Sequence, residues 1–264
     1  MTLSHSHLLN TLCSYHIPLP IACWVHSFLQ DWHTSICLDG KRDKLWPIEI
    51  GVPQGSCVSP ILAAYFTSPM VGEVHCVATS WIKGCTELST LVRDDKATLS
   101  PTTLYVDDGA ILASGPTLDA TAKIVTIAFK ETHKWLANRG LKTDQVKNEL
   151  MHFMKTKNWT NNPSVHIPSN NPDTCKEVTS TSCMRYLGLW FDPQLRFHEH
   201  AKITASKASR ATEALCMLGN STSGINQLCL RQLYLGAILP IMTYSSVAFW
   251  NGKSPALKST LECT

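Results

Sequence analysis

The chain has 264 residues, of which 44% are hydrophobic, and its 23 basic and 20 acidic side chains leave a formal net charge of +3. A chain of this length and composition can fill a hydrophobic core, which excludes a disordered or fibrous protein. The small net charge permits a nucleic-acid partner without requiring one.

Eleven cysteines are spread along the chain, and no two of them form a Cys-x-x-Cys pair. Zinc ribbons and disulfide frameworks need paired spacing, so we interpret these cysteines as reduced, mostly packed thiols of an intracellular protein. His198 and His200 could form a metal pair, but no third ligand is suitably spaced, and we expect them instead to cap the start of a helix. We expect no signal peptide and no membrane span.

The first part of the chain predicts two helices and a hairpin. Apolar residues recur at helical spacing over residues 8–29, and Pro18 and Pro20 divide this segment into two helices. Residues 34–50 predict a β-hairpin, with Asp39-Gly40 as its turn.

The next elements are a loop, a helix and a second hairpin. A loop over residues 51–58 leads into a helix, for which Ser59 is the expected N-cap and Pro60 stands in the first turn. Residues 83–101 are polar, and we predict no element there. Two apolar runs over residues 104–113 predict a buried hairpin.

A long amphipathic helix is predicted from Leu118 to Asn138, and Gly140 ends it. Residues 150–154 have the composition of a strand. Residues 156–182 are rich in Asn, Pro, Ser and Thr, which is typical of a loop or a domain boundary.

The last part predicts one short strand and two helices. The strand covers residues 186–191, and the helices cover residues 197–218 and 225–239. Gly219 ends the first helix, and Pro240 ends or kinks the second. Hairpins and helices in this order predict an α+β fold.

Asp107 and Asp108 are the first candidates for chemistry, because two like charges stand side by side at a predicted hairpin turn. A divalent cation relieves their repulsion, and carboxylate oxygens suit Mg²⁺, which keeps coordination positions for phosphate. The simpler alternative is a solvated turn, because Asp-Asp-Gly is good turn chemistry.

The loop of residues 51–56, Gly-Val-Pro-Gln-Gly-Ser, is the second candidate. Glycine lets a backbone approach a base or a sugar closely, and the amide of Gln54 both donates and accepts hydrogen bonds. The alternative is an ordinary connection between a strand and a helix.

Together and in this order, the two motifs resemble the reverse transcriptases of non-LTR (LINE-type) retrotransposons, particularly the fungal type. Nearly the whole chain takes part in the resemblance. Residues 51–62 are similar to the segment beneath the templating base, and Tyr105–Asp108 are similar to the catalytic Tyr-x-Asp-Asp turn. Residues 140–149 are similar to the segment whose lysine lies near the triphosphate. Residues 186–188 are similar to the primer grip, and residues 196–250 are similar to the thumb.

The resemblance implies a fold: a partial right-hand polymerase palm, built from an antiparallel sheet and packed helices, followed by a helical thumb. Residues 1–155 would form part of the palm and fingers, and 156–182 a linker or loop. Residues 183–196 would carry the primer grip, with Tyr186, Leu187 and Gly188 at its centre, and 197–264 the thumb.

The resemblance also implies a mechanism with two Mg²⁺ (or Mn²⁺) ions, an RNA template, a DNA primer and deoxynucleotides. Asp107 would bind metal directly and Asp108 would assist. Lys147 would act as a general acid toward pyrophosphate, unless it is a solvated surface charge. Pro53, Gln54, Gly55 and Tyr105 would line the nucleotide pocket. Members of the family act in the nucleus.

One departure from the family concerns a further aspartate, which the family carries on a strand before the first helix. Asp31, Asp39 and Asp43 follow the first helices and cannot replace it. We therefore expect missing upstream palm, fingers and endonuclease segments, and a chain that is inactive by itself.

Two alternatives remain. The first is a non-catalytic relic that binds nucleic acid through Lys202, Lys207, Arg210 and Arg231. The second is a metal hydrolase that uses the two aspartates.

Overall fold

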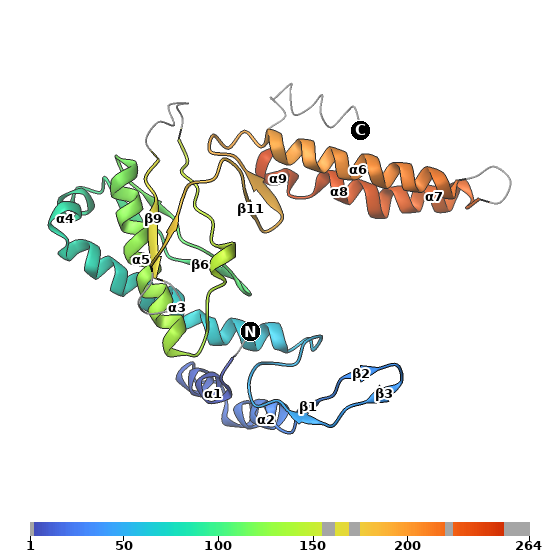
Figure 1. Cartoon of the computed structure of the whole chain (residues 1–264), viewed down its shortest axis with the longest axis horizontal. Helices are drawn as coiled ribbons and strands as arrows, with labels where there is room; N and C mark the ends of the chain where they lie inside the picture. Colours follow the sequence, from blue (N-terminus) through green and yellow to red (C-terminus); the bar gives the residue numbers. More distant parts are fainter. Residues whose placement is uncertain (1–2, 155–161, 169–174, 220–223, 251–264) are drawn as a thin grey trace. The chain divides into compact units, whose positions relative to one another are not determined.

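The computed structural model describes residues 3–154, 162–168, 175–219 and 224–250. The chain folds into two compact units (Figure 1). The N-terminal unit comprises residues 1–148 and 163–179, and the C-terminal unit comprises residues 149–162 and 180–264.

The N-terminal unit begins with the two helices that the prolines predicted, α1 (His5–Ser14) and α2 (Leu19–Leu29). Their apolar faces pack against the first half of α3 (Ser59–Gly84). This core contains Leu3, Leu8, Leu12, Val25, Leu29, Leu62, Phe66 and Leu141, all of them buried.

The predicted first hairpin is confirmed, as two short antiparallel ladders. β1 (His33–Thr34) pairs with β4 (Trp46–Pro47), and β2 (Cys37–Leu38) pairs with β3 (Lys41–Arg42). Asp39 and Gly40 have φ angles of 49° and 76°, as a two-residue type I′ turn requires. Every residue of these four strands is exposed.

Two long helices, α3 and α5 (Leu118–Asn138), pack against each other in the N-terminal unit. The observed bounds of α5 are the predicted ones. Thr117 caps it by accepting a hydrogen bond from the Ala120 backbone, and Gly140 follows it with a φ of 73°.

The start of α3 differs from the prediction. Ser59 is its first helical residue rather than its N-cap, because its hydroxyl donates instead to the backbone carbonyl of Pro53.

One helix was missed entirely. α4 (Thr86–Arg93) occupies part of the segment for which no element was predicted. Only Leu88 of this helix is buried, where it packs with Ile82 and Ile124. Leu91 and Val92 are partly buried against the same cluster, so the helix has apolar residues at helical spacing. It is only eight residues long, and so short a periodic run is hard to recognise within a polar segment.

The second predicted hairpin exists, but it is not buried. β6 (Thr103–Tyr105) pairs with β7 (Asp108–Ala110), and β5 (Thr98–Leu99) pairs with β8 (Ala113–Ser114). No residue of β6 or β7 is fully buried. Only Leu104 reaches the core cluster of Met70, Val74 and Trp135, which is why the apolar runs suggested more burial than they have.

Part of the predicted loop over residues 156–182 is a hairpin instead. β9 (Val165–Pro168) and β10 (Cys175–Val178) pair antiparallel, and β9 packs on α5. Val165, Ile167 and Val178 are buried. The strands are short and lie among polar residues, so the sequence did not indicate them. Residues 155–161 and 169–174 lie outside the described part.

In the C-terminal unit, the strand predicted over residues 150–154 is reduced to a single bridge. Leu150 bridges Ser180, and its carbonyl accepts a hydrogen bond from the Thr181 backbone at 2.8 Å. The strand predicted over residues 186–191 is a hairpin of β11 (Met184–Tyr186) and β12 (Leu189–Phe191).

The helices of this unit follow the hairpin. α6 (His198–Leu218) starts one residue after its predicted beginning and ends at Gly219 as predicted. α7 (Gln227–Leu233), the π-helical turn η2 (Tyr234–Ile238) and α8 (Leu239–Thr243) follow one another directly, before α9 (Ser246–Phe249). The helical path therefore continues past Pro240, and the wider η2 turn stands where the proline ring needs space. Residues 251–264 of the predicted thumb lie outside the described part.

One further expectation needs correction, and one stays untested. The ten cysteines in the described part are free, but seven of them are exposed rather than packed. Two described helical stretches, Ser59–Gly84 and Gln227–Phe249, are long and apolar enough to cross a membrane by length and composition alone, which is weak evidence and leaves the expectation of no span a prediction. Nine residues of the first are buried within its own unit, as in the core helix of a soluble protein.

Candidate functional site

Asp107 and Asp108 lie at the tip of the β6–β7 hairpin, as predicted. Tyr105 pairs with Asp108, so Val106 and Asp107 form a two-residue turn, and both carboxylates are exposed. Val106 has a φ of 58°, a left-handed conformation that is unusual for a β-branched residue. Such local strain persists where the surrounding structure holds it, and it is concentrated at functional sites.

The carboxylate pair has the donor chemistry of a Mg²⁺ or Mn²⁺ site in part. Two adjacent Asp side chains supply hard oxygen ligands, and their exposure leaves room for water and phosphate oxygens. Within the described ranges, no group of three or more His, Cys, Asp or Glu side chains is placed to hold a metal ion. The pair thus fits a cation that takes its remaining ligands from outside these residues.

The Gln54 loop is held at its base and open at its tip. The Gly51 backbone N–H donates to the Leu3 carbonyl, and the Gly51 carbonyl lies 2.7 Å from Nε2 of His5. Gly51 and Gly55 have φ angles of 90° and 89°, which favour glycine at both positions. Gln54 and Gly55 are exposed, so the loop presents them to solvent, while Pro53 is half-buried.

Both predicted motifs contact helix α3. The Gln54 loop leads into its first residue, Ser59, and the hairpin rests on Met70 and Val74 through Leu104. Eleven residues of helix separate Ser59 from Met70, which corresponds to about 17 Å along the axis. The two motifs therefore belong to one unit, and a shared cleft between them stays a prediction.

Lys147 lies in the short 3-10 helix η1 (Gln145–Lys147), and its side chain is exposed. Its ammonium group pairs with the Asp144 carboxylate at 3.3 Å. Hydrogen bonds from the Val146 backbone and from Lys147 lower the pKa of Asp144. An exposed pair of this kind is weak and opens readily, so Lys147 is free to exchange partners.

The predicted primer-grip residues form a tight turn rather than part of one strand. Leu187 and Gly188 connect β11 and β12 with φ angles of 48° and 82°. Two successive positive φ angles define a type I′ turn, in which glycine is favoured. Tyr186 pairs with Leu189 at the base of the turn.

His200 of α6 supports this hairpin instead of capping its helix. Its Nδ1 atom lies 3.4 Å from the Trp190 backbone N–H, which donates to it, and its ring packs on Phe249. The side chain is 2% exposed. Sequence reasoning missed this role, because it depends on residues that are distant along the chain.

His200 also predicts a pH dependence. Burial lowers the pKa of its imidazole, a backbone hydrogen bond with Tyr244 opposes this, and Lys207 lowers the pKa further. The unfolded chain takes up this proton near pH 6.5, before the folded chain does. The contribution of neutral His200 to the free energy of unfolding is therefore complete above about pH 6.5. This contribution decreases as the pH drops from there toward the lower pKa of the folded state.

Thermal unfolding of the C-terminal unit between pH 5 and pH 8 measures this effect. We expect His200→Gln to flatten the decline, and we expect His198→Gln, an exposed position on the same helix, to leave it unchanged. An equal decline in the His200 variant would contradict the assignment.

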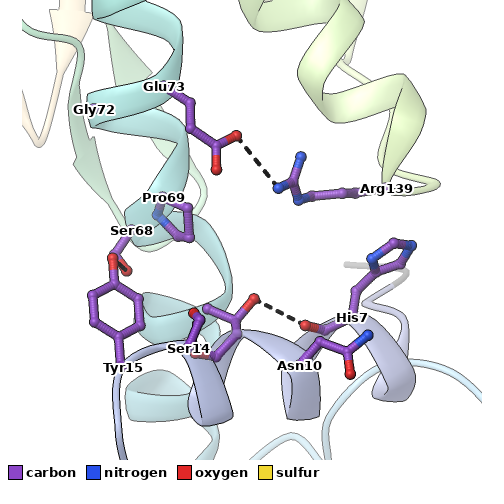
Figure 2. A pocket seen from close by; sticks show the side chains of 10 residues that line it. His7, Asn10, Ser14, Tyr15, Ser68, Pro69, Gly72, Glu73 and Arg139 are labelled. Atoms are coloured by element: carbon purple, nitrogen blue, oxygen red, sulfur yellow. Dashed lines mark hydrogen bonds and ion pairs between the residues drawn. The ribbon is translucent and has the colours of Figure 1, made fainter.

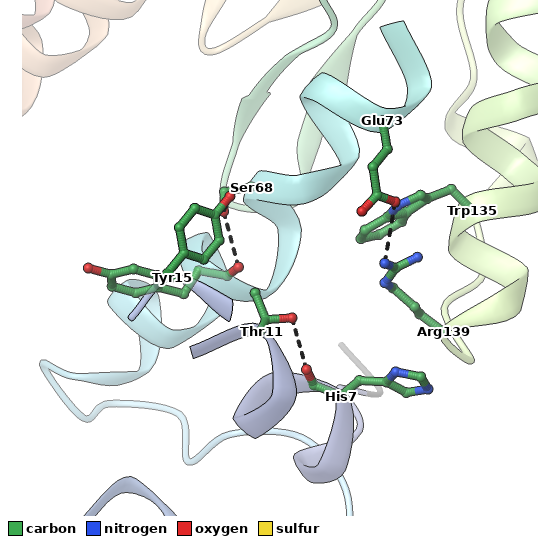
Figure 3. Close-up of polar contacts among 8 residues, drawn as sticks. His7, Thr11, Tyr15, Ser68, Glu73, Trp135 and Arg139 are labelled. Atoms are coloured by element: carbon green, nitrogen blue, oxygen red, sulfur yellow. Dashed lines mark hydrogen bonds and ion pairs between the residues drawn. The ribbon is translucent and has the colours of Figure 1, made fainter. Parts of the chain in front are cut away.

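A polar pocket of about 530 Å³ lies elsewhere in the N-terminal unit, among α1, α3 and the end of α5 (Figure 2). The Arg139 guanidinium lies 3.7 Å above the Trp135 ring and 3.4 Å from the Glu73 carboxylate, which also accepts from Trp135 at 2.6 Å (Figure 3). On the other side, the Ser68 and Tyr15 hydroxyls meet at 2.9 Å. Sequence reasoning missed the pocket because three distant segments form it.

Comparison with known proteins gives one family. A family model described as reverse transcriptase (RNA-dependent DNA polymerase) matches residues 1–191. No solved structure matches significantly.

Three relatives from insects are similar to the chain at low identity. The Nasonia vitripennis Pol polyprotein from the type-1 retrotransposable element R1 2 is 25% identical over 76% of this chain and 43% of its own length. In Drosophila melanogaster, the probable RNA-directed DNA polymerase from transposon BS is 23% identical over 88% of this chain and 23% of its own length. The polymerase from the mobile element jockey is 25% identical over 67% of this chain and 17% of its own length. The chain thus spans less than half the length of each.

Proposed function

Because the chain belongs to the reverse transcriptase (RNA-dependent DNA polymerase) family, we propose that it is the palm and thumb part of a retrotransposon polymerase of the non-LTR type. Its substrates are then an RNA template, a DNA primer and deoxynucleotides. The relatives from retrotransposable and mobile elements support the type of element, although none of them identifies a fungal origin. Synthesis at a genomic target would place the protein in the nucleus.

The observation that carries this proposal is the exposed carboxylate pair at the strained tip of the β6–β7 hairpin. When bound, two divalent cations supply activation of the primer 3′-hydroxyl and neutralisation of the leaving pyrophosphate. Asp107 offers its carboxylate as a direct ligand from the turn itself. Asp108, which is paired in β7, supports the same position from the strand.

Other residues have roles in holding the nucleotide. The exposed Gln54 and Gly55, with Pro53 at the base of their loop and Tyr105 beside the hairpin tip, would bind its base and sugar. Lys147, released from Asp144, would donate a proton to the leaving pyrophosphate.

A second function, nucleic-acid binding without catalysis, is favoured by exposed cations on the C-terminal helices. Lys202, Lys207 and Arg210 lie on α6 and Arg231 lies on α7, and all four are exposed. In the described part of the chain, none of them is in an ion pair. Cations placed in this way can follow a phosphate backbone.

The whole chain tests both functions when it is mixed with a labelled RNA template annealed to a DNA primer. We expect binding that weakens steeply as the salt concentration increases. The slope of the logarithm of the binding constant against the logarithm of the salt concentration should become shallower by about 1 for each phosphate contact removed. Lys207→Gln should reduce the slope, and Lys96→Gln, which breaks a pair with Asp94 in the other unit, should not.

Primer extension with deoxynucleotides and Mg²⁺ or Mn²⁺ separates the two functions. We expect extension that is slow at most, because the sequence predicts a chain that is inactive by itself and the described residues gather no third metal-binding side chain beside the aspartates. Binding with no extension under any metal favours the binding module. No binding at low salt would contradict both.

A further inference from the structure

The turn at Leu187 and Gly188 is covered by one aromatic side chain from the other end of its unit. Tyr244 follows α8, and its hydroxyl donates a hydrogen bond of 2.7 Å to the Leu187 carbonyl. A Cβ atom added at Gly188 would lie 3.0 Å from Cε1 and from the hydroxyl oxygen of Tyr244, and 3.2 Å from Cζ. The ring therefore lies directly on the turn, and a side chain at position 188 would push it away by a few tenths of an ångström. The φ of 82° at Gly188 favours glycine independently.

The contact is specific to the turn and does not fill a core. Tyr244 is 50% exposed, so its ring is not enclosed by a core. Its polar atom, by contrast, is placed on one backbone carbonyl of a two-residue turn. The second strand of the same hairpin contacts His200 of α6, because the Trp190 N–H donates to it, and His200 also has a hydrogen bond with the backbone of Tyr244 rather than with its ring.

We propose that Tyr244 is a positioning residue for the primer. It fixes the position and orientation of the Leu187–Gly188 turn, and that turn in its place positions the primer 3′ end. The proposal rests on the primer role proposed for residues 186–188. Tyr244 directly follows α8 and the η2 turn, so a movement of these helices would also move the proposed primer contact.

Tyr244→Phe tests the proposal in the full chain, because it removes the hydroxyl and keeps the ring. Tyr234→Phe is the matched control: Tyr234 lies in the η2 turn with 41% of its side chain exposed. The first readout is amide hydrogen exchange at residues 187–189. We expect exchange there to become about three- to tenfold faster in Tyr244→Phe, which corresponds to the loss of one hydrogen bond, and to stay unchanged in Tyr234→Phe.

The second readout is the ratio of affinities for a template–primer with a recessed 3′ end and for a blunt duplex of equal length. We expect the ratio to fall about threefold or more in Tyr244→Phe, while the affinity for the blunt duplex and the unfolding midpoint change little. A role in stability alone would not move this ratio.

These measurements distinguish a failure of the Tyr244 role from a failure of the primer role of residues 186–188. If the unaltered chain shows no preference for a recessed end, the proposed primer role fails and the inference fails with it. If the preference exists and Tyr244→Phe retains it, only the inference is overturned. Unchanged exchange at residues 187–189 also overturns the inference, whatever the chain binds.

Gly188→Ala provides an independent check. We expect it to reduce the preference for the recessed end, because the new methyl group displaces the Tyr244 ring. In a Tyr244→Ala background the same change should have a smaller effect, because the ring is absent. Equal effects in both backgrounds would contradict the direct contact.

Discussion

Asp107→Asn is expected to reduce the affinity of the chain for Mn²⁺, measured with nucleotide present, by about tenfold or more. The change keeps the size of the side chain and removes the charge that attracts the cation. The hairpin should still form, because asparagine is also a good turn residue. Primer extension should fall by about a hundredfold or more, below detection for a slow enzyme.

Asp39→Asn is the control for Asp107→Asn. Asp39 is also exposed and also lies in a two-residue hairpin turn, where its φ is 49°. Asn-Gly is as favourable there as Asp-Gly, so neither the fold nor metal binding should change. Unaltered Mn²⁺ affinity in Asp107→Asn, or an equal loss in Asp39→Asn, would contradict the assignment of the metal site.

Phe66→Ala is expected to lower the free energy of unfolding of the N-terminal unit by about 3–5 kcal/mol. Phe66 is 1% exposed and lies in the core formed by α1, α2 and α3. Its ring also meets Trp135 of α5 edge to face, with ring centres 6.5 Å apart. Alanine would leave a cavity where these helices meet. Urea denaturation followed by circular dichroism measures the loss.

Ile61→Ala on the same helix is the control for Phe66→Ala. Ile61 is 56% exposed, so its truncation should change stability by no more than about 0.5 kcal/mol. A loss of similar size at both positions would show that the packing of α3 differs from that described.

The elements that local sequence predicted well are those with strong local signals. α5 combines apolar periodicity with a cap at Thr117 and a glycine at 140, and its observed bounds are the predicted ones. The Asp39-Gly40 turn and the split between α1 and α2 are equally local, because they depend on residues with restricted or unusual backbone angles.

The elements that were missed depend on contacts with distant residues. α4 is held by Leu88 against Ile124, and β9 lies on α5. Both elements are short, eight and four residues, so their own apolar patterns are too brief to identify them. The hairpin at residues 184–191 looked like one strand, although Gly188 permits the turn and the ring of Tyr244 covers it. Pro240 was expected to end or kink its helix; the helix does not end there, and a π turn precedes the proline.

The same division holds for the candidate site. The sequence by itself determined the order of motifs, the family they indicate and the carboxylate pair at a hairpin tip, because residue type and spacing along the chain carry that information. Only the tertiary structure decided that the hairpin is exposed and that both it and the Gln54 loop are attached to α3. It alone showed Tyr244 and His200 supporting the second hairpin, since burial and contact arise from packing among segments far apart in the chain.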